Sequence, residues 1–462
     1  MKHYVIAIAS ALLFAAGNAL AQNESSARAT LPDPVLDALV ITAVENTPEL
    51  AAARAAVEAA RRRVEPARTL GDPSLSTTYQ NDGRSLSLRK AEGSFVGLML
   101  SQPLPWPGKL ALAGQTAASE TREIESGTLG RAGLMIEARV RNAWYDLILA
   151  HALDRLIEER RATARQIEAT TRDRYAAGLA VQQDVLRAQV ELARIDELKA
   201  TQRAVIVSRL AELNRVLGLP QDAARDTPAD LPPIVLSPTA SWIGSALARS
   251  PEAAGARQAI ETGRLRVQIA KKNFFPDFVV SAGSMYRAGW EMGPMWQVGI
   301  GVSLPVWSNK RQQNQLAEAQ ARVTEQTAQT DVISLELELR TRERIAQLQT
   351  ANEVAVLYRD TIVLLDQLSY ESALASYQAG KVPFITVFDA VNVLYSDRAS
   401  YLGRLAEAAK WRVAIDEAAL QPTAMGSAPS MPSGGGAAAS GMSAKAPASS
   451  GSSSAAASTS MR

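Results

Sequence analysis

Apolar side chains recur with a helical period near the N-terminal end of the chain. A spacing of i, i+3, i+4, i+7 and i+8 predicts an amphipathic helix, and it is met by Leu36, Leu39, Val40, Ala43 and Val44. Pro73 ends the helical region that follows, because proline lacks the amide hydrogen that a continuing helix needs.

Two pairs of shorter segments alternate with a period of two and predict strands near 74–79, 95–102, 277–286 and 297–304. In the second pair, one face is apolar: Phe278, Val280, Ala282, Val298, Ile300, Val302 and Leu304. The opposite face is small or polar: Ser281, Gly283, Gly299, Gly301 and Ser303. This alternation is typical of a water-filled transmembrane barrel. A strand pair half-buried in a soluble core gives the same pattern, so the alternation alone does not distinguish the two interpretations.

Aromatic residues near the strand ends favour the membrane reading, because barrels carry aromatic girdles at the lipid interface. They are Tyr79, Phe95, Tyr286, Trp290 and Trp296. Four strands cannot close a barrel in lipid, where every backbone polar group needs an internal partner. Several subunits must therefore contribute, and three chains would give twelve strands.

Very long helices are predicted between the strands and the glycine turns. Proline is absent between Pro107 and Pro220, and both glycine and proline are absent between Pro305 and Gly380. A continuous helix across the second window would be on the order of 110 Å long. Helices of this length are coiled-coil or tunnel elements, and Val185, Ala188, Leu192 and Ile195 have heptad-like spacing.

The same order of elements occurs twice: a helix, two strands, a long helical stretch, a glycine turn and a second long helix. Thr47-Pro48 and Ser250-Pro251 lie 203 positions apart, and the turn glycines Gly178 and Gly380 lie 202 apart. A constant offset over such a span indicates a duplicated half rather than a short repeat. We expect a first repeat at 22–219 with strands at about 73–104 and a tip near 178, a linker at 220–238, and a second repeat at 239–420 with strands at about 276–305 and a tip near 380.

The chain ends carry separate signals. Residues 1–21 have the positive start, apolar core and Ala19-Leu20-Ala21 cleavage motif of a signal peptide, which predicts export. Residues 421–462 form a Ser, Ala and Gly tail with Met425, Met431, Met442 and Met461, and are expected to be disordered. Thioether capture of soft metals is one reading of these methionines, and a solvated linker is the other.

Composition narrows the function. Without Lys2 the chain has 48 basic and 47 acidic residues, so no excess positive field favours a nucleic-acid partner. The absence of cysteine excludes disulfides and an N-terminal lipidated cysteine. After signal-peptide removal His151 is the only histidine, a poor basis for a zinc site or a catalytic triad. We expect no enzymatic activity and no cofactor.

These features together resemble the TolC family of outer-membrane efflux proteins over residues 36–416. The resemblance is carried by the duplicated halves, the strand exits SQPLPWPGK at 101–109 and SLPVW at 303–307, and the two Tyr-x-Ala-Gly turns. It implies a mainly α protein with a small β part: four strands per chain in a twelve-stranded trimeric barrel, and a helical tunnel in the periplasm. It also implies a homotrimer in outer-membrane lipid that acts as a passive exit duct for a periplasmic adaptor (membrane fusion) protein and an inner-membrane pump.

The resemblance also implies two sets of site residues. The hairpin tips that would meet the adaptor are Gly178-Leu179 and Gly380-Lys381; glycine suits such reversals because it tolerates positive φ. The alternative is that these glycines only turn the chain.

The tunnel gate would include Asp184, Tyr377 and Asp389, and an aspartate ring would favour cations. For Asp184, a helix N-cap role is an alternative. The gate departs from the best-known member of the family at Val382, where that protein has a basic residue, and at Thr386, where it has an acidic one.

The Trp-Pro-Gly-Lys element at 106–109 resembles the heavy-metal-cation branch of the family, which implies a pump of the resistance-nodulation-division type. The substrates are expected to be heavy-metal cations or drugs. The main rival reading is a soluble periplasmic coiled-coil adaptor or scaffold, although adaptors normally carry one long hairpin rather than two.

Overall fold

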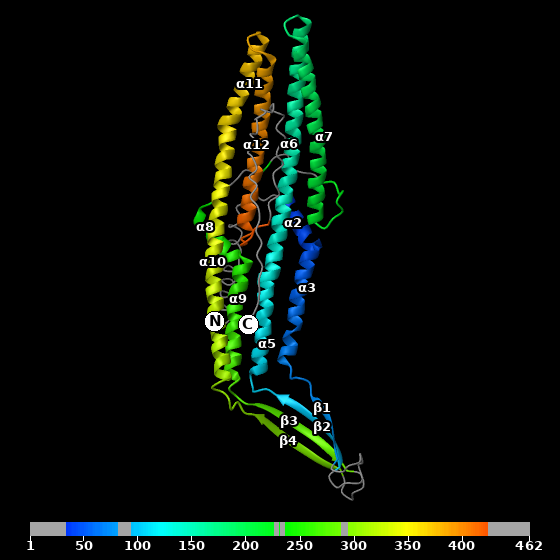
Figure 1. Ribbon diagram of the computed structural model, residues 1–462, viewed down its shortest axis with the longest axis vertical. Helices are drawn as coiled ribbons and strands as arrows, with labels where there is room; N and C mark the ends of the chain where they lie inside the picture. Colours follow the sequence, from blue (N-terminus) through cyan, green and yellow to red (C-terminus); the bar gives the residue numbers. More distant parts are fainter. Residues whose placement is uncertain (1–33, 82–93, 226–230, 232–235, 288–293, 424–462) are drawn as a thin grey trace, which may run out of the picture. The chain divides into compact units, whose positions relative to one another are not determined.

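Helices and strands occur in the order that the sequence predicts. The computed structural model describes residues 34–81, 94–225, 231, 236–287 and 294–423 (Figure 1). The elements of the first half are α2 (Pro34–Asn46), α3 (Pro48–Arg62), α4 (Val64–Arg68), β1 (Ser74–Gln80), β2 (Phe95–Leu104), α5 (Lys109–Ile124), η1 (Glu125–Leu129), α6 (Gly130–Ala176) and α7 (Gln182–Val216). Those of the second half are α8 (Thr239–Arg249), α9 (Pro251–Lys272), β3 (Asp277–Tyr286), β4 (Met295–Ser303), α10 (Gln312–Leu357), η2 (Tyr358–Ile362), α11 (Val363–Gln378) and α12 (Phe384–Asp416).

Two helical hairpins dominate the fold. α6 and α7 pack along each other and form the first hairpin, and α12 packs along α10 and α11 to form the second (Figure 1). α12 also packs against α6, and this contact joins the two hairpins. Within the described residues, no helix has both the length and the hydropathy that crossing a membrane requires.

The middle of α6 is surrounded by other helices. Every residue from 142 to 150 is buried, because α2, α7 and α12 all contact this helix. Trp144 is fully buried there and belongs to a core shared with Leu36 of α2, Leu213 of α7 and Val413 of α12. The predicted stripe of α2 is confirmed in part, since Leu36, Leu39 and Ala43 are its buried residues.

The long helical stretch expected between Pro305 and Gly380 is confirmed from Gln312 to Gln378, although it is not a regular α-helix throughout. α10 begins only at Gln312, and the π-helical turn η2 separates it from α11. A second π-helical turn, η1, separates α5 from α6. Such turns insert extra residues into a helix and have no simple sequence signature, so the absence of glycine and proline could not reveal η2.

The four strands form one antiparallel sheet in the order β1-β2-β3-β4. The predicted bounds of β3 are confirmed, and those of the other strands differ by one or two residues at one or both ends. In the register, Val280 lies opposite Ile300 and Ala282 opposite Val298, while Ser281 lies opposite Gly299. The apolar positions of the two strands therefore share one face, and the small and polar positions share the other.

The predicted signal peptide (1–21) lies outside the described residues. The predicted tail also does so from residue 424 onward, as does most of the 226–235 part of the linker.

Candidate functional site

Both hairpins reverse direction through the same turn. Gly178 and Gly380 each have φ of +71°, a conformation that costs other residues about 1–2 kcal/mol. In the first tip (177–181), the amide of Gly178 donates to the Tyr175 carbonyl at 2.9 Å and that of Leu179 to the Arg174 carbonyl at 2.8 Å. In the second tip (379–383), the amides of Gly380 and Lys381 bond in the same way. This is the Schellman pattern of helix C-termini.

The tips present different side chains to solvent. Leu179 is 66% exposed and Val181 is exposed as well, so the first tip is apolar. Lys381 is exposed at the second tip. A Cβ added at Gly178 would meet no atom within 4 Å, whereas one added at Gly380 would lie 3.7 Å from Nη2 of Arg174. Both glycines are therefore required by backbone conformation and not by lack of space.

Arg174, near the end of α6, links the two tips. Its guanidinium donates to the Gln378 carbonyl of the second hairpin and, at 3.2 Å, to the Leu179 carbonyl of its own. The same guanidinium lies 4.9 Å from the centroid of the Tyr377 ring. This contact could not be predicted from the sequence, because the Tyr-x-Ala-Gly turn gives no sign that an arginine one position earlier reaches across to the other hairpin.

The structure does not bring the three predicted gate residues together. Tyr377 is buried against Phe384, at 5.9 Å between ring centroids, Asp184 is half-buried and Asp389 is exposed. Among the described residues, no hydrogen bond or ion pair joins any two of them. The Tyr377 hydroxyl is buried without a hydrogen-bond partner in the described chain.

The alternative N-cap role for Asp184 is wrong. Val181 is the N-cap residue of α7, and no side chain caps that end. Asp184 lies in the first turn of the helix instead, where a carboxylate interacts favourably with the helix dipole.

Polar side chains buried between the helices fix how the two hairpins pack. Lys410 of α12 bonds to Asp146 of α6, and both side chains are almost fully buried. Further toward the tips, Arg160 of α6 donates to Glu191 of α7 at 2.6 Å and to Asn392 of α12 at 2.7 Å. Because each of these groups loses a partner if a helix slides, they specify the alignment of the helices.

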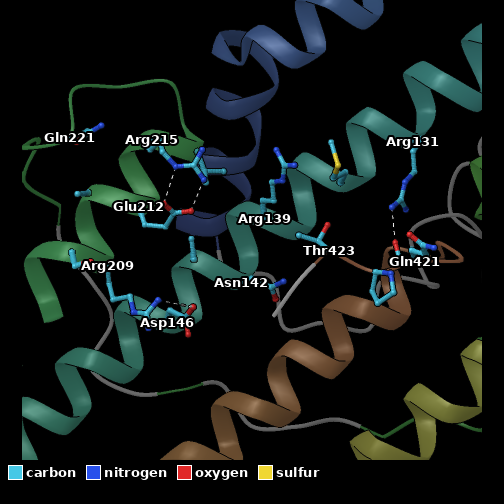
Figure 2. A pocket seen from close by; sticks show the side chains of 16 residues that line it. Arg131, Arg139, Asn142, Asp146, Arg209, Glu212, Arg215, Gln221, Gln421 and Thr423 are labelled. Carbon is cyan, nitrogen blue, oxygen red and sulfur yellow. Dashed lines mark hydrogen bonds and ion pairs between the residues drawn. The ribbon is translucent and has the colours of Figure 1, made fainter. Parts of the chain in front are cut away.

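A polar cavity of about 700 Å³ is lined by α6, α7 and the segment after α12 (Figure 2). Its arginines are paired with acids of the chain: Arg215 with Glu212 at 2.6 Å, Arg139 with Glu49 at 3.1 Å, Arg131 with Glu417 at 3.2 Å and Arg209 with Asp146 at 3.9 Å. The cavity therefore offers no unbalanced charge to a ligand. Among the described residues, no group of three or more His, Cys, Asp or Glu side chains could hold a metal ion. His151 lies half-buried on α6, and burial lowers its pKa.

The sheet is joined to the helices at the predicted strand exits. The Trp106 amide donates to a carboxylate oxygen of Asp277 at 2.7 Å, and Nζ of Lys109 lies 2.9 Å from the same carboxylate. The Trp106 ring stacks on Phe275 and Phe278, with centroid distances of 5.0 and 5.9 Å. Asp277, whose sequence context predicts only a strand residue, thus anchors the Trp-Pro-Gly-Lys element to β3.

The apolar face of the sheet extends over all four strands. The register continues the face from Ile300 and Val280 through Leu98 and Leu100 to Leu75. Tyr79, Tyr286 and Trp296 lie toward one end of this face and are all exposed. An apolar surface with aromatic residues at its end is the pattern of a sheet that faces lipid.

Comparison with known proteins decides between the readings that the sequence left open. The family described as "Outer membrane efflux protein" matches residues 39–219 and 242–420. The chain belongs to this family. Outer membrane efflux proteins are not enzymes or soluble adaptors, and the predicted efflux function and outer-membrane location are confirmed.

The sequence identity to individual relatives is low. The cobalt-zinc-cadmium resistance protein CzcC of Cupriavidus metallidurans is 24% identical over 382 residues, which cover 82% of this chain and 88% of the relative. Among solved structures, the outer membrane protein VceC of Vibrio cholerae matches with a TM-score of 0.67 and 20% identity, over 83% of this chain and 96% of VceC. The outer-membrane channel OprN matches with a TM-score of 0.68 and 19% identity, over 84% and 90% of the two chains. The fold is therefore that of outer-membrane channels.

Proposed function

We propose that three copies of this chain form the exit duct of a tripartite efflux system, with a twelve-stranded barrel in the outer membrane and a helical tunnel in the periplasm. The observation that carries the proposal is the four-stranded sheet, which has one apolar face and ends in β1 and β4. Neither edge strand has a further partner among the described residues. In lipid these edges must pair, and β1 of one copy with β4 of the next is the pairing that closes a ring.

Each half of the chain supplies one strand pair and one hairpin in this assembly. The repeats span 22–219 and 239–420, with the linker at 220–238 between them, 1–21 as the cleaved signal peptide and 421–462 as the tail. The shared geometry of the two glycine turns supports the two-fold repeat.

The tips dock the periplasmic adaptor, through Gly178 and Leu179 on the first hairpin and Gly380 and Lys381 on the second. The exposed Leu179 supports this role, because an apolar side chain at a rigid turn suits a protein contact. Asp184, Tyr377 and Asp389 belong to the gate of the tunnel. Arg174 holds the two tips together while that gate is closed.

The substrates are metal cations delivered by an inner-membrane pump of the resistance-nodulation-division type. This part of the proposal is supported by the name of the relative CzcC, a cobalt-zinc-cadmium resistance protein, and by the Trp-Pro-Gly-Lys element.

Conductance across a planar lipid bilayer tests the duct. The purified protein is expected to form pores in the bilayer, seen as discrete conductance steps. Both small cations and small anions should pass through them. Val298→Asp and Ile300→Asp, on the apolar face, should prevent insertion. Gln297→Asp, on the opposite face of β4, is the matched control and should still insert. Equal insertion by all three variants would contradict the assignment of the lipid face.

A further inference from the structure

The apolar surface of the sheet continues past the end of β4 into the turn that follows this strand. Leu304, Val306 and Trp307 are 67%, 71% and 73% exposed. A tryptophan exposed to this extent beside two exposed aliphatic residues is unusual on a surface that faces water alone, and it marks a contact surface.

Two cations share the side of the turn on which Trp307 lies. The amides of Lys310 and Arg311 both donate to the Trp307 carbonyl at 3.0 Å, so the segment is coiled as in a helix. Residues three and four positions apart lie on one side of such a turn. Trp307, Lys310 and Arg311 therefore form one surface, which we name the Trp307 turn.

The segment that contains the Trp307 turn has no acidic residue to pair with its two cations. Lys310 and Arg311 are exposed, and no aspartate or glutamate occurs from residue 304 to 317. In the described part of the chain, neither cation takes part in an ion pair. An anion outside the chain is thus the natural partner.

The first strand exit provides an internal comparison. Trp106 and Lys109 occur 201 positions before Trp307 and Lys310, but Trp106 stacks on Phe275 and Phe278 and Lys109 bonds to Asp277. At the first exit, the tryptophan and lysine side chains therefore make their contacts with other residues of the same chain. The second leaves the corresponding side chains on the surface.

We infer that the Trp307 turn binds anionic phospholipid headgroups in the periplasmic leaflet of the outer membrane. Tryptophan prefers the headgroup level of a bilayer, and lysine and arginine bind the phosphates there. The inference rests on the proposed function, because it requires the apolar face that ends at Val302 and Leu304 to lie in lipid. The bound lipid would hold the sheet at a fixed depth relative to the helices.

Lipid selection tests the two cations. The full-length protein is reconstituted in nanodiscs with equal amounts of phosphatidylglycerol and phosphatidylcholine, and the lipids retained after detergent extraction are counted by native mass spectrometry. K310Q/R311Q should lower the preference for phosphatidylglycerol by about five-fold per charge, on the order of 25-fold together. R322Q/R342Q, which removes two exposed arginines farther along α10, should leave it unchanged. An unchanged preference in K310Q/R311Q would overturn the inference.

Fluorescence quenching by brominated phospholipids tests Trp307. Trp307→Phe and Trp296→Phe should each remove part of the quenchable emission, and Trp411→Phe on α12 should remove none. If only Trp296→Phe reduces quenching, a neighbouring copy of the chain covers Trp307 and the lipid inference is wrong while the duct stands. If neither variant reduces it, the sheet is not in the bilayer and the proposed function fails.

Discussion

The guanidinium of Arg174 lies over the ring of Tyr377, 4.9 Å from its centroid, and so connects the ends of two hairpins that belong to different halves of the chain. The same group donates to the Gln378 carbonyl. A cation held by an aromatic face and a carbonyl restrains the second tip without a permanent salt bridge. Such a contact can be broken when a partner docks on the tips.

Arg174→Ala should loosen the closed tunnel. Loss of the cation–π contact and of the carbonyl bonds is expected to weaken the tip contact by about 2 kcal/mol, about thirty-fold in the ratio of closed to open states. Single-channel conductance in planar bilayers should rise. Arg172→Ala is the control, because Arg172 pairs with Glu168 on its own helix; an equal rise in both variants would show that Arg174 has no special role.

Gly178→Val should abolish efflux while the assembled protein remains intact. The turn needs φ of +71°, which a β-branched residue resists by about 1–2 kcal/mol or more, so the first tip would be distorted where the adaptor is proposed to dock. The readout is metal tolerance of cells, with assembly followed by the migration of the unheated protein in detergent. Gly133→Ala in α6, where an added Cβ meets nothing within 4 Å, should retain efflux. Efflux that persists in Gly178→Val would show that the first tip is not a docking site.

Asp146→Leu should destabilise the protein strongly. It leaves the buried ammonium of Lys410 without its carboxylate, which costs about 3–5 kcal/mol. The double variant D146L/K410M should recover much of the loss in thermal unfolding, because it removes both charges of the buried Lys410–Asp146 pair. Glu407→Leu removes an acid from an exposed pair with Arg404 and should change the stability by less than about 1 kcal/mol. A double variant as unstable as Asp146→Leu would contradict this account.

The contact between α11 and α12 should strengthen in mild acid. Burial and the hydrogen bond with Asp397 raise the pKa of Asp366. A raised carboxyl pKa gives stability that is fully present below the unfolded value and is lost as pH rises through the folded value. Asp366→Asn, a neutral mimic of the acid, should therefore raise the Tm at pH 8 and have little effect at pH 4.

Asp360→Asn serves as the control for this pH dependence. Asp360 is exposed and its pKa is lowered by the hydrogen bond with Arg359, so its replacement should not raise the Tm at pH 8. The decisive quantity is the difference in Tm between the wild-type protein and Asp366→Asn. If this difference is the same at pH 4 and pH 8, the pair of Asp366 and Asp397 has no role in the pH dependence.

The strands and the glycine turns could be predicted because their signals are local. Alternation from Phe278 to Leu304 fixes which side chains share a face, and the geometry of Gly178 and Gly380 follows from a conformation that only glycine adopts easily. The register agrees with the first prediction, pairing Val280 with Ile300.

The contacts between distant elements could not be predicted in the same way. Arg174 and Tyr377, or Asp277 and Lys109, are joined only by the packing of helices and strands far apart in the chain. An exposed arginine, a buried one and one that bridges two hairpins look alike in a sequence. The η2 turn was missed for a similar reason, since no residue type marks it.

The mass of the purified particle tests the central claim most directly. Native mass spectrometry after extraction in detergent should give three chains per particle, each lacking the first 21 residues of the sequence. A single chain that stays soluble without detergent would contradict the account of a trimeric outer-membrane duct.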